Sequence, residues 1–409
     1  MVIKTHSKFE TYRKNIILKN ITLTYPLWFL ACLLVLMLAA CSSSDGGELG
    51  GGTERQSAKL AIYVYAPEQA AAQTRADVGD VDPVNNTANE GIIKSLKLWI
   101  YETETGNHVG YFSTEDVEAL NEGQGATYQI PVSDEFAANK PLVDVYVMAN
   151  VTEGNCGVGV GTLNESTSRA DLIEGAKITG HFGLGDRVKS VPDDGLPFAG
   201  KLTARPVVGD APALRVGTEA EPSTVELTRA VSKLRFVFSK ATGSPEVKIT
   251  SIKIDASMIP EVEYLFKTPE PETVTYNGSE SELLSSAIDD IAVTDDPTKF
   301  IYTDQEAQAY EDLINEAANK QAPEKPEVTV EGPIYLRESD RQLTGTITYT
   351  IDGVAQDPAS FTMTQAGDFT RNHTWIVYAY YAGSGNLKVQ TIYVKNWKGR
   401  EVNRDFYNW

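Results

Sequence analysis

Short β-strand patterns recur along the chain, and they constrain its fold more than any other feature. Residues 59–66, 92–101 and 142–149 are rich in Val, Ile, Leu and Tyr. Further runs of the same kind cover 225–227, 232–238, 247–255, 342–351, 374–381 and 386–395. The segments between them hold Gly, Asn, Asp and Pro, which are the residues of tight turns. Short strands separated by such turns predict an all-β protein built from β-sandwiches.

The first of these runs, residues 59–66, is apolar on both of its faces, so we expect a strand that is buried between two layers. Helical patterns are few. Residues 304–322 predict a helix and residues 168–175 a shorter one, and we expect both to lie at the surface and pack on sheets. The 409 residues are enough for about two domains. A composition shift over 206–222, rich in Pro and Gly, predicts the boundary between them.

The N-terminal region reads as an export signal. Residues 27–40 form an apolar run that is shorter than the roughly 20 residues of a membrane-spanning helix. The run ends in small residues directly before Cys41, as in the lipobox of a bacterial lipoprotein. We therefore expect residues 1–40 to be removed and Cys41 to carry a lipid such as palmitate. The alternative is an uncleaved anchor in which the cysteine is incidental.

Charge and cysteine content exclude several classes of function. The chain has 36 Lys and Arg against 56 Asp and Glu, a formal net charge of −20, which argues against nucleic acid as a partner. Once Cys41 is acylated, only Cys156 remains in the mature chain, so no internal disulfide can form. No cation lies near Cys156 in the sequence, and we interpret it as a structural thiol rather than a nucleophile.

Residues for catalysis or metal binding form no motif. His108, His181 and His373 stand far apart, and no hydrolase or metal-binding signature accompanies them. We expect no enzyme activity, no cofactor and no metal site. A catalytic triad whose members lie far apart in the sequence would, however, leave no such motif. Asp77 and its acidic neighbours Asp80 and Asp82 could bind Ca²⁺, but we interpret them as a solvated loop. We interpret His373 as a turn or packing residue.

Three stretches, taken in order, resemble one known family. The first is the lipobox, followed by a strand, the pair Arg75-Ala76, an acidic glycine-containing loop and a second strand. The second is the apolar strand that ends at Ala149-Asn150. The third is 227–236 (LTRAVSKLRF), with Arg371-Asn372-His373 and a Trp-containing C terminus further on. Together they resemble the FimA-type fimbrillins, the lipoprotein-borne subunits of type V pili in Bacteroidia.

The resemblance implies a domain organisation. After the signal peptide (1–40), residues 41–75 would form a tether and a removable strand. Two tandem transthyretin-like β-sandwich domains would follow, 76–224 and 225–409. The lipid would hold the precursor in the outer membrane, and the mature protein would enter an extracellular fimbrium that supports adhesion.

The resemblance also implies how the precursor is activated. An arginine-specific protease would cut between Arg75 and Ala76 and release the strand that contains Leu60, Ile62 and Val64. The vacated edge would accept a donor strand from another pilin subunit, in a polymer of this chain joined by anchor or tip pilins.

The donor strand of the family lies at the C terminus, and this is where the chain departs from the pattern. The corresponding apolar residues are Trp397, Val402, Phe406 and Trp409, but they do not alternate as a strand with one buried face requires. The alternative is that this segment forms an edge strand of its own domain. The alternative function is a monomeric or pilus-anchoring cell-surface binding lipoprotein that keeps its N-terminal strand.

Overall fold

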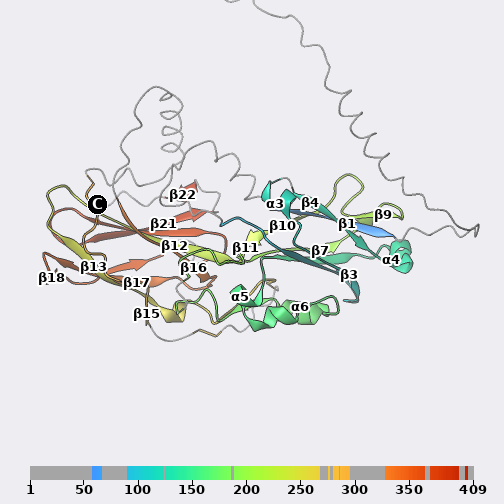
Figure 1. The fold of residues 1–409 in the computed structure, drawn as a ribbon, viewed down its shortest axis with the longest axis horizontal. Coiled ribbons are helices and arrows are strands. Elements are labelled where there is room, and N and C mark those ends of the chain that lie inside the picture. Colours follow the sequence, from blue (N-terminus) through green and yellow to red (C-terminus); the bar gives the residue numbers. More distant parts are fainter. Residues whose placement is uncertain are drawn as a thin grey trace, which may run out of the picture. The chain divides into compact units, whose positions relative to one another are not determined.

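The structure, a computed structural model, describes most of one compact unit, residues 56–409. The described residues are 58–66, 90–123, 125–185, 188–267, 275–276, 280–284, 286–294, 328–363, 369–395 and 401–403. They form an all-β protein with a few short helices, as the sequence predicts (Figure 1). Their strands make up four five-stranded sheets and one small two-stranded sheet.

The first sandwich consists of two five-stranded sheets. One sheet has the order β10-β1-β9-β8, and β4 pairs with the other edge of β1. Its strands are β1 (Lys59–Tyr65), β4 (Ala126–Pro131), β8 (Val207–Val208), β9 (Ala213–Val216) and β10 (Thr224–Glu226). The other has the order β11-β7-β5-β2-β3. Its strands are β2 (Leu96–Glu102), β3 (His108–Thr114), β5 (Val143–Ala149), β7 (Phe198–Arg205) and β11 (Thr228–Arg229).

The second sandwich has the same two-sheet plan. One sheet has the order β16-β12-β20-β21-β22. Its strands are β12 (Val231–Lys240), β16 (Thr329–Arg337), β20 (Thr374–Tyr381), β21 (Lys388–Lys395) and β22 (Glu401–Asn403). The other has the order β15-β13-β17-β18, with β19 also on β17. Its strands are β13 (Val247–Asp255), β15 (Glu280–Glu282), β17 (Thr344–Ile351), β18 (Val354–Ala355) and β19 (Ala359–Thr362).

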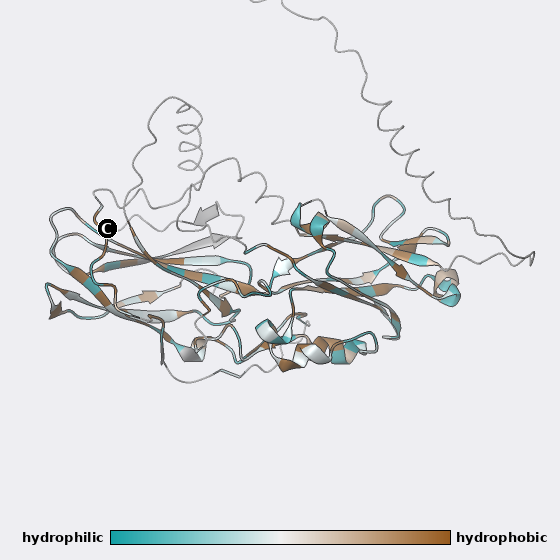
Figure 2. Cartoon of the chain, in the orientation of Figure 1, coloured by the Kyte–Doolittle hydropathy of each residue, from teal (hydrophilic) through white to brown (hydrophobic). Residues whose placement is uncertain are grey.

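Each sandwich has its own apolar core between its two sheets. Along the strands, hydrophobic stretches alternate with hydrophilic ones, because successive side chains of a strand point to opposite faces (Figure 2). β5 and β12 differ, since all of their residues are buried. β12 lies inside its sheet, parallel to β20 and antiparallel to β16.

A third cluster joins the two sandwiches, and four short helices lie beside the strands. The helices are α3 (Glu118–Asn121), α4 (Asp134–Asn139), α5 (Glu153–Cys156) and α6 (Arg169–Gly175), with 3-10 turns at Val158–Thr162 and Ala256–Met258. α6 confirms the helix predicted at 168–175: the Ser168 hydroxyl caps it by accepting from the Asp171 N–H. Leu172 packs with Trp99 in a cluster that also contains Tyr335 of the second sandwich. The predicted helix at 304–322 lies outside the described residues.

Two further links connect the sandwiches. β6 (Lys177–Thr179) pairs antiparallel with β14 (Val262–Tyr264). The chain itself passes from one sandwich to the other at Ala230, between β11 and β12. The segment 206–222, predicted from composition as the boundary, instead contains β8 and β9 of the first sandwich. Its Pro and Gly residues are the turns around these short strands.

Candidate functional site

The candidate site is the position of β1 within its sheet. β1 pairs antiparallel with β4 over Lys59–Val64. On its other edge it pairs parallel with β9 over Lys59–Ala61 and then with β10 over Tyr63–Tyr65. Among the described strands, β4 pairs with no other than β1. Removal of β1 would therefore leave unpaired backbone N–H and C=O groups on both sides of the gap. We call that gap, lined by β4, β9 and β10, the β1 slot.

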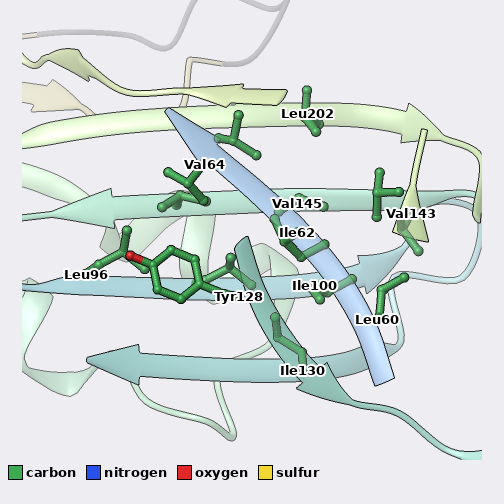
Figure 3. Packing of buried hydrophobic residues seen from close by; sticks show 14 of the residues in the cluster. Leu60, Ile62, Val64, Leu96, Ile100, Tyr128, Ile130, Val143, Val145 and Leu202 are labelled. Carbon is green, nitrogen blue, oxygen red and sulfur yellow. The ribbon is translucent and has the colours of Figure 1, made fainter. Parts of the chain in front are cut away.

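The inward face of β1 is entirely apolar. Leu60, Ile62 and Val64 are 0% exposed, and Ala58 and Ala66 beside the strand are also buried. Figure 3 shows the labelled side chains of β1 and β4 packed over those of β2, β5 and β7 in the core of the first sandwich. The residues predicted for the removable strand thus lie together on one buried face.

The outward face of β1 corrects the prediction made from sequence. Ala61, Tyr63 and Tyr65 are only partly buried, and Lys59 is exposed. The expectation that residues 59–66 are buried on both faces is therefore wrong for this face. Tyr combines an apolar ring with a polar hydroxyl, so it fits a half-buried face as well as a buried one. The presence of tyrosines in residues 59–66 therefore does not show whether that face is buried.

Two glycines bring the sides of the β1 slot close to the opposite sheet. A Cβ atom on Gly110 of β3 would lie 2.6 Å from Cγ2 of Ile130 of β4. A Cβ atom on Gly200 of β7 would overlap the carbonyl oxygen of Glu226 of β10. Only glycine allows these close approaches. They join β4 to β3 and β10 to β7 through contacts in which β1 takes no part.

Glu90 resumes the described chain after the gap at 67–89, and a buried set of polar groups holds it. Nζ of Lys233 lies 3.0 Å from Oε2 of Glu90, and the Tyr335 hydroxyl donates to Oε1 at 2.6 Å. Nε of Arg229 donates to the Glu90 carbonyl oxygen at 3.0 Å. All of these residues are buried. We call this set the Glu90 clasp.

Burial disfavours the charged forms of the two cations in the Glu90 clasp. Burial lowers the pKa of Lys233 to about 8, while the charge of Glu90 opposes that shift. Burial likewise lowers the pKa of Arg229 to about 9. A buried charge without its partner is strongly unfavourable, so each member of the pair needs the other. The clasp fixes the chain between the predicted cleavage pair and β2.

Sequence reasoning missed the Glu90 clasp. The stretch 227–236 carries the family resemblance and includes Arg229 and Lys233, but nothing in the sequence indicates Glu90 as their partner. The only available signal was an alternation in this stretch, in which Arg229, Lys233 and Arg235 stand at odd positions while the even positions are mostly apolar.

A second, partly buried ion cluster surrounds Arg371. Its Nε donates to Oε2 of Glu338 at 2.6 Å, and Nη2 lies 3.0 Å from Oε1 of Glu263. The guanidinium also donates to the carbonyl oxygens of Tyr264 and Leu265. Burial raises the pKa of Glu263 to about 7, and the charge of Arg371 opposes this. The cluster borders a pocket of about 310 Å³ next to β7.

The remaining candidate residues for chemistry have local roles. Nδ1 of His373 lies 2.9 Å from Oγ1 of Thr370 and 2.6 Å from the carbonyl oxygen of Arg371, as expected of a turn residue. Cys156 is buried, and burial raises the pKa of its thiol. Among the described residues, no group of His, Cys, Asp and Glu is placed to hold a metal ion. In the same part of the chain, no helix is long and apolar enough to cross a membrane.

The predicted processing and donor residues fall mostly outside the described part of the chain. Cys41, the pair Arg75-Ala76 and the acidic loop that follows lie outside it. So do three of the predicted donor residues, Trp397, Phe406 and Trp409. The fourth, Val402, belongs to β22, whose backbone pairs with β21 at the edge of the second sandwich.

Comparison with known proteins gives structural matches only. No family model matches the chain, and no curated protein matches it in sequence. The fold is similar to that of the tip fimbrial protein Mfa3 from Porphyromonas gingivalis, with 10% identity and a TM-score of 0.46 over 82% of this chain and 98% of that one. Two proteins from Parabacteroides distasonis are also similar. One is a candidate cell adhesion protein (14% identity, TM-score 0.47, 85% and 99% covered) and the other a fimbrial assembly protein (13%, 0.43, 86% and 100%).

These neighbours are fimbrial and cell-adhesion proteins, the class that the sequence resembles. Because the TM-scores are below 0.5, the function proposed next rests on the residues and geometry of this chain.

Proposed function

We propose that this chain is the precursor of a fimbrial subunit with a role in adhesion at the cell surface. It is exported as a lipoprotein, loses β1 by proteolysis and joins a fimbrium by donor-strand exchange. The observation that carries the proposal is the position of β1. It is the first strand of the described chain, yet it lies inside a sheet whose other strands all come from residue 126 onwards.

This topology allows β1 to be removed by one cut. No described strand precedes β1, and the chain between β1 and Glu90 contains the pair Arg75-Ala76. Cleavage after Arg75 would free β1 from the mature chain without breaking any other strand connection. The Glu90 clasp holds the mature chain on the far side of the cut, so β2 keeps its place in the opposite sheet.

The energetics suit a strand that is stable before cleavage and replaceable after it. The three fully buried aliphatic side chains of β1 contribute about 6 kcal/mol together. Each backbone hydrogen bond along its two edges adds about 1 kcal/mol, before the cost of ordering the strand. A strand from another chain that fills the β1 slot regains most of this free energy, as in β-strand addition generally.

The proposal includes the location and partners of the precursor. Cys41 carries the lipid that holds the precursor in the outer membrane, and an arginine-specific protease acts at Arg75. Other pilus subunits are the partners of the mature chain. Without residues 1–40, which carry +4, the net charge changes from −20 to −24, and this charge keeps assembled fibres soluble and mutually repelling.

Substitution of Arg75 tests the proposal. Wild-type protein from sheared cell surfaces should begin at Ala76 and give a ladder of multimers on a non-boiled gel. Arg75→Ala should give a monomer that keeps a lipidated Cys41. Arg55→Ala is the matched control, because a cut at Arg55 would leave β1 in the chain. Multimers of Arg75→Ala at normal yield would contradict the proposal.

The complete pairing of β1 also favours a second function. A chain that is never cut would keep β1 and act as a monomeric or pilus-anchoring surface lipoprotein. The same measurement separates the two, since wild-type protein with a lipidated N-terminal Cys41 and no multimers would support this second function.

A further inference from the structure

The β1 slot accepts only apolar side chains at its inward positions. Leu60, Ile62 and Val64 fill these positions in the precursor, and each is 0% exposed. The surrounding cluster consists of hydrophobic side chains from both sheets. Its one hydroxyl on β4, that of Tyr128, has its pKa raised by burial to about 12, so it stays neutral and cannot offset a charge. An occupant that placed a charged side chain here would bury that charge unpaired.

The C-terminal segment of this chain does not meet that requirement. In 396–409 (NWKGREVNRDFYNW), every set of three alternating positions contains at least one charged residue. The most apolar set on one face, Val402 and Phe406, has Arg404 between them at the place of Ile62. On the other face, the most apolar set is Asp405, Tyr407 and Trp409, which includes the charge of Asp405.

Part of the C-terminal segment pairs with a strand of the second sandwich. β22 (Glu401–Asn403) pairs antiparallel with β21, with Val402 opposite Val394. Residues 401–403 are therefore the edge strand of their own domain. This pairing is independent of the residue pattern that excludes residues 396–409 from the β1 slot.

We propose that the β1 slot is filled by a strand from a different polypeptide, not by residues 396–409 of a second copy of this chain. That strand carries apolar side chains at three successive alternating positions. The chain is then an acceptor in a mixed assembly. This inference rests on the proposed function and specifies its partner.

Peptide uptake by the cleaved protein tests the inference. The full chain in detergent is cut with an arginine-specific protease, which is then inactivated, and binding of fluorescent peptides is followed by anisotropy and on a non-boiled gel. One pair of peptides is 57–66 and its Ile62→Arg variant. The other is 396–409 and its Arg404→Val variant, which creates an apolar set at 402, 404 and 406.

The expected result is uptake of 57–66 and of the Arg404→Val peptide. The unchanged 396–409 peptide and the Ile62→Arg peptide should bind about 100-fold more weakly, because each buries an unpaired guanidinium. Binding of unchanged 396–409 within about tenfold of 57–66 would overturn the inference. A failure of Arg404→Val to improve binding would also overturn it, since the charge would not be the reason for exclusion.

Failure of the proposed function would give a different result. In that case the cleaved protein would retain its 41–75 fragment through gel filtration, as seen by mass analysis, and would take up none of the peptides. That outcome would overturn both the strand exchange and the inference built on it.

Discussion

Shortening Ile62 to Ala should loosen β1 while leaving its backbone pairing in place. Ile62 lies at the centre of the strand, opposite Tyr128 of β4, and is 0% exposed. Loss of a buried isoleucine side chain to alanine costs about 2–5 kcal/mol, because a cavity remains where the side chain was. Lys59→Ala, on the same strand but exposed, should change the free energy of unfolding by less than about 0.5 kcal/mol and is the matched control.

The effect of Ile62→Ala should differ before and after proteolysis. In the uncleaved precursor, the loss lowers the free energy of unfolding of the first sandwich. After cleavage at Arg75, only non-covalent contacts hold β1, so the same loss weakens its retention. A loss of about 3 kcal/mol corresponds to about 100-fold faster dissociation of the released segment.

Two measurements test this prediction. Urea denaturation of the uncleaved chain gives the change in stability, and gel filtration at intervals after cleavage gives the rate at which the 41–75 fragment leaves. If Ile62→Ala matched Lys59→Ala in both midpoint and release rate, β1 would not be held by its inward side chains and the reasoning would be refuted.

Three further predictions concern the supports of the site. Gly200→Ala should destabilise the chain by about 1–3 kcal/mol in urea denaturation, because the new Cβ displaces the backbone at Glu226; unchanged stability would contradict it. Glu90→Gln should lower the free energy of unfolding by about 3–5 kcal/mol, because buried Lys233 loses the carboxylate that faces it, and adding Lys233→Met should restore much of it; an additive loss would exclude the pairing. For Glu263, whose pKa rises from an ordinary 4.5 to about 7, the folded state keeps a proton that the unfolded state loses. The free energy of unfolding should therefore fall by up to about 3 kcal/mol as pH rises through this range, and Glu263→Gln should flatten that slope.

Local sequence pattern was enough for many elements of the fold. β13 and β20 begin and end where their runs of β-branched and aromatic residues predict, and α6 begins directly after its Ser168 cap. The pattern was insufficient to predict whether another part of the protein covers a given face of a strand. The tyrosines of β1 suggested two buried faces, but the structure buries only one of them. Likewise, the Pro- and Gly-rich residues 206–222 suggested a linker, but they form turns around two core strands.

The sequence by itself determined the inward set Leu60, Ile62 and Val64, since alternation along a strand is a local property. It also determined the mismatch of the C-terminal segment, since that too is a matter of residue order. Only the tertiary structure decided that β1 lies inside a sheet between β4 and the strands β9 and β10. It alone paired Glu90 with Lys233, 143 residues away in the chain. The reason is physical: the side-chain period of a strand is fixed by its own backbone, whereas its neighbours are chosen by the packing of distant segments against a shared core.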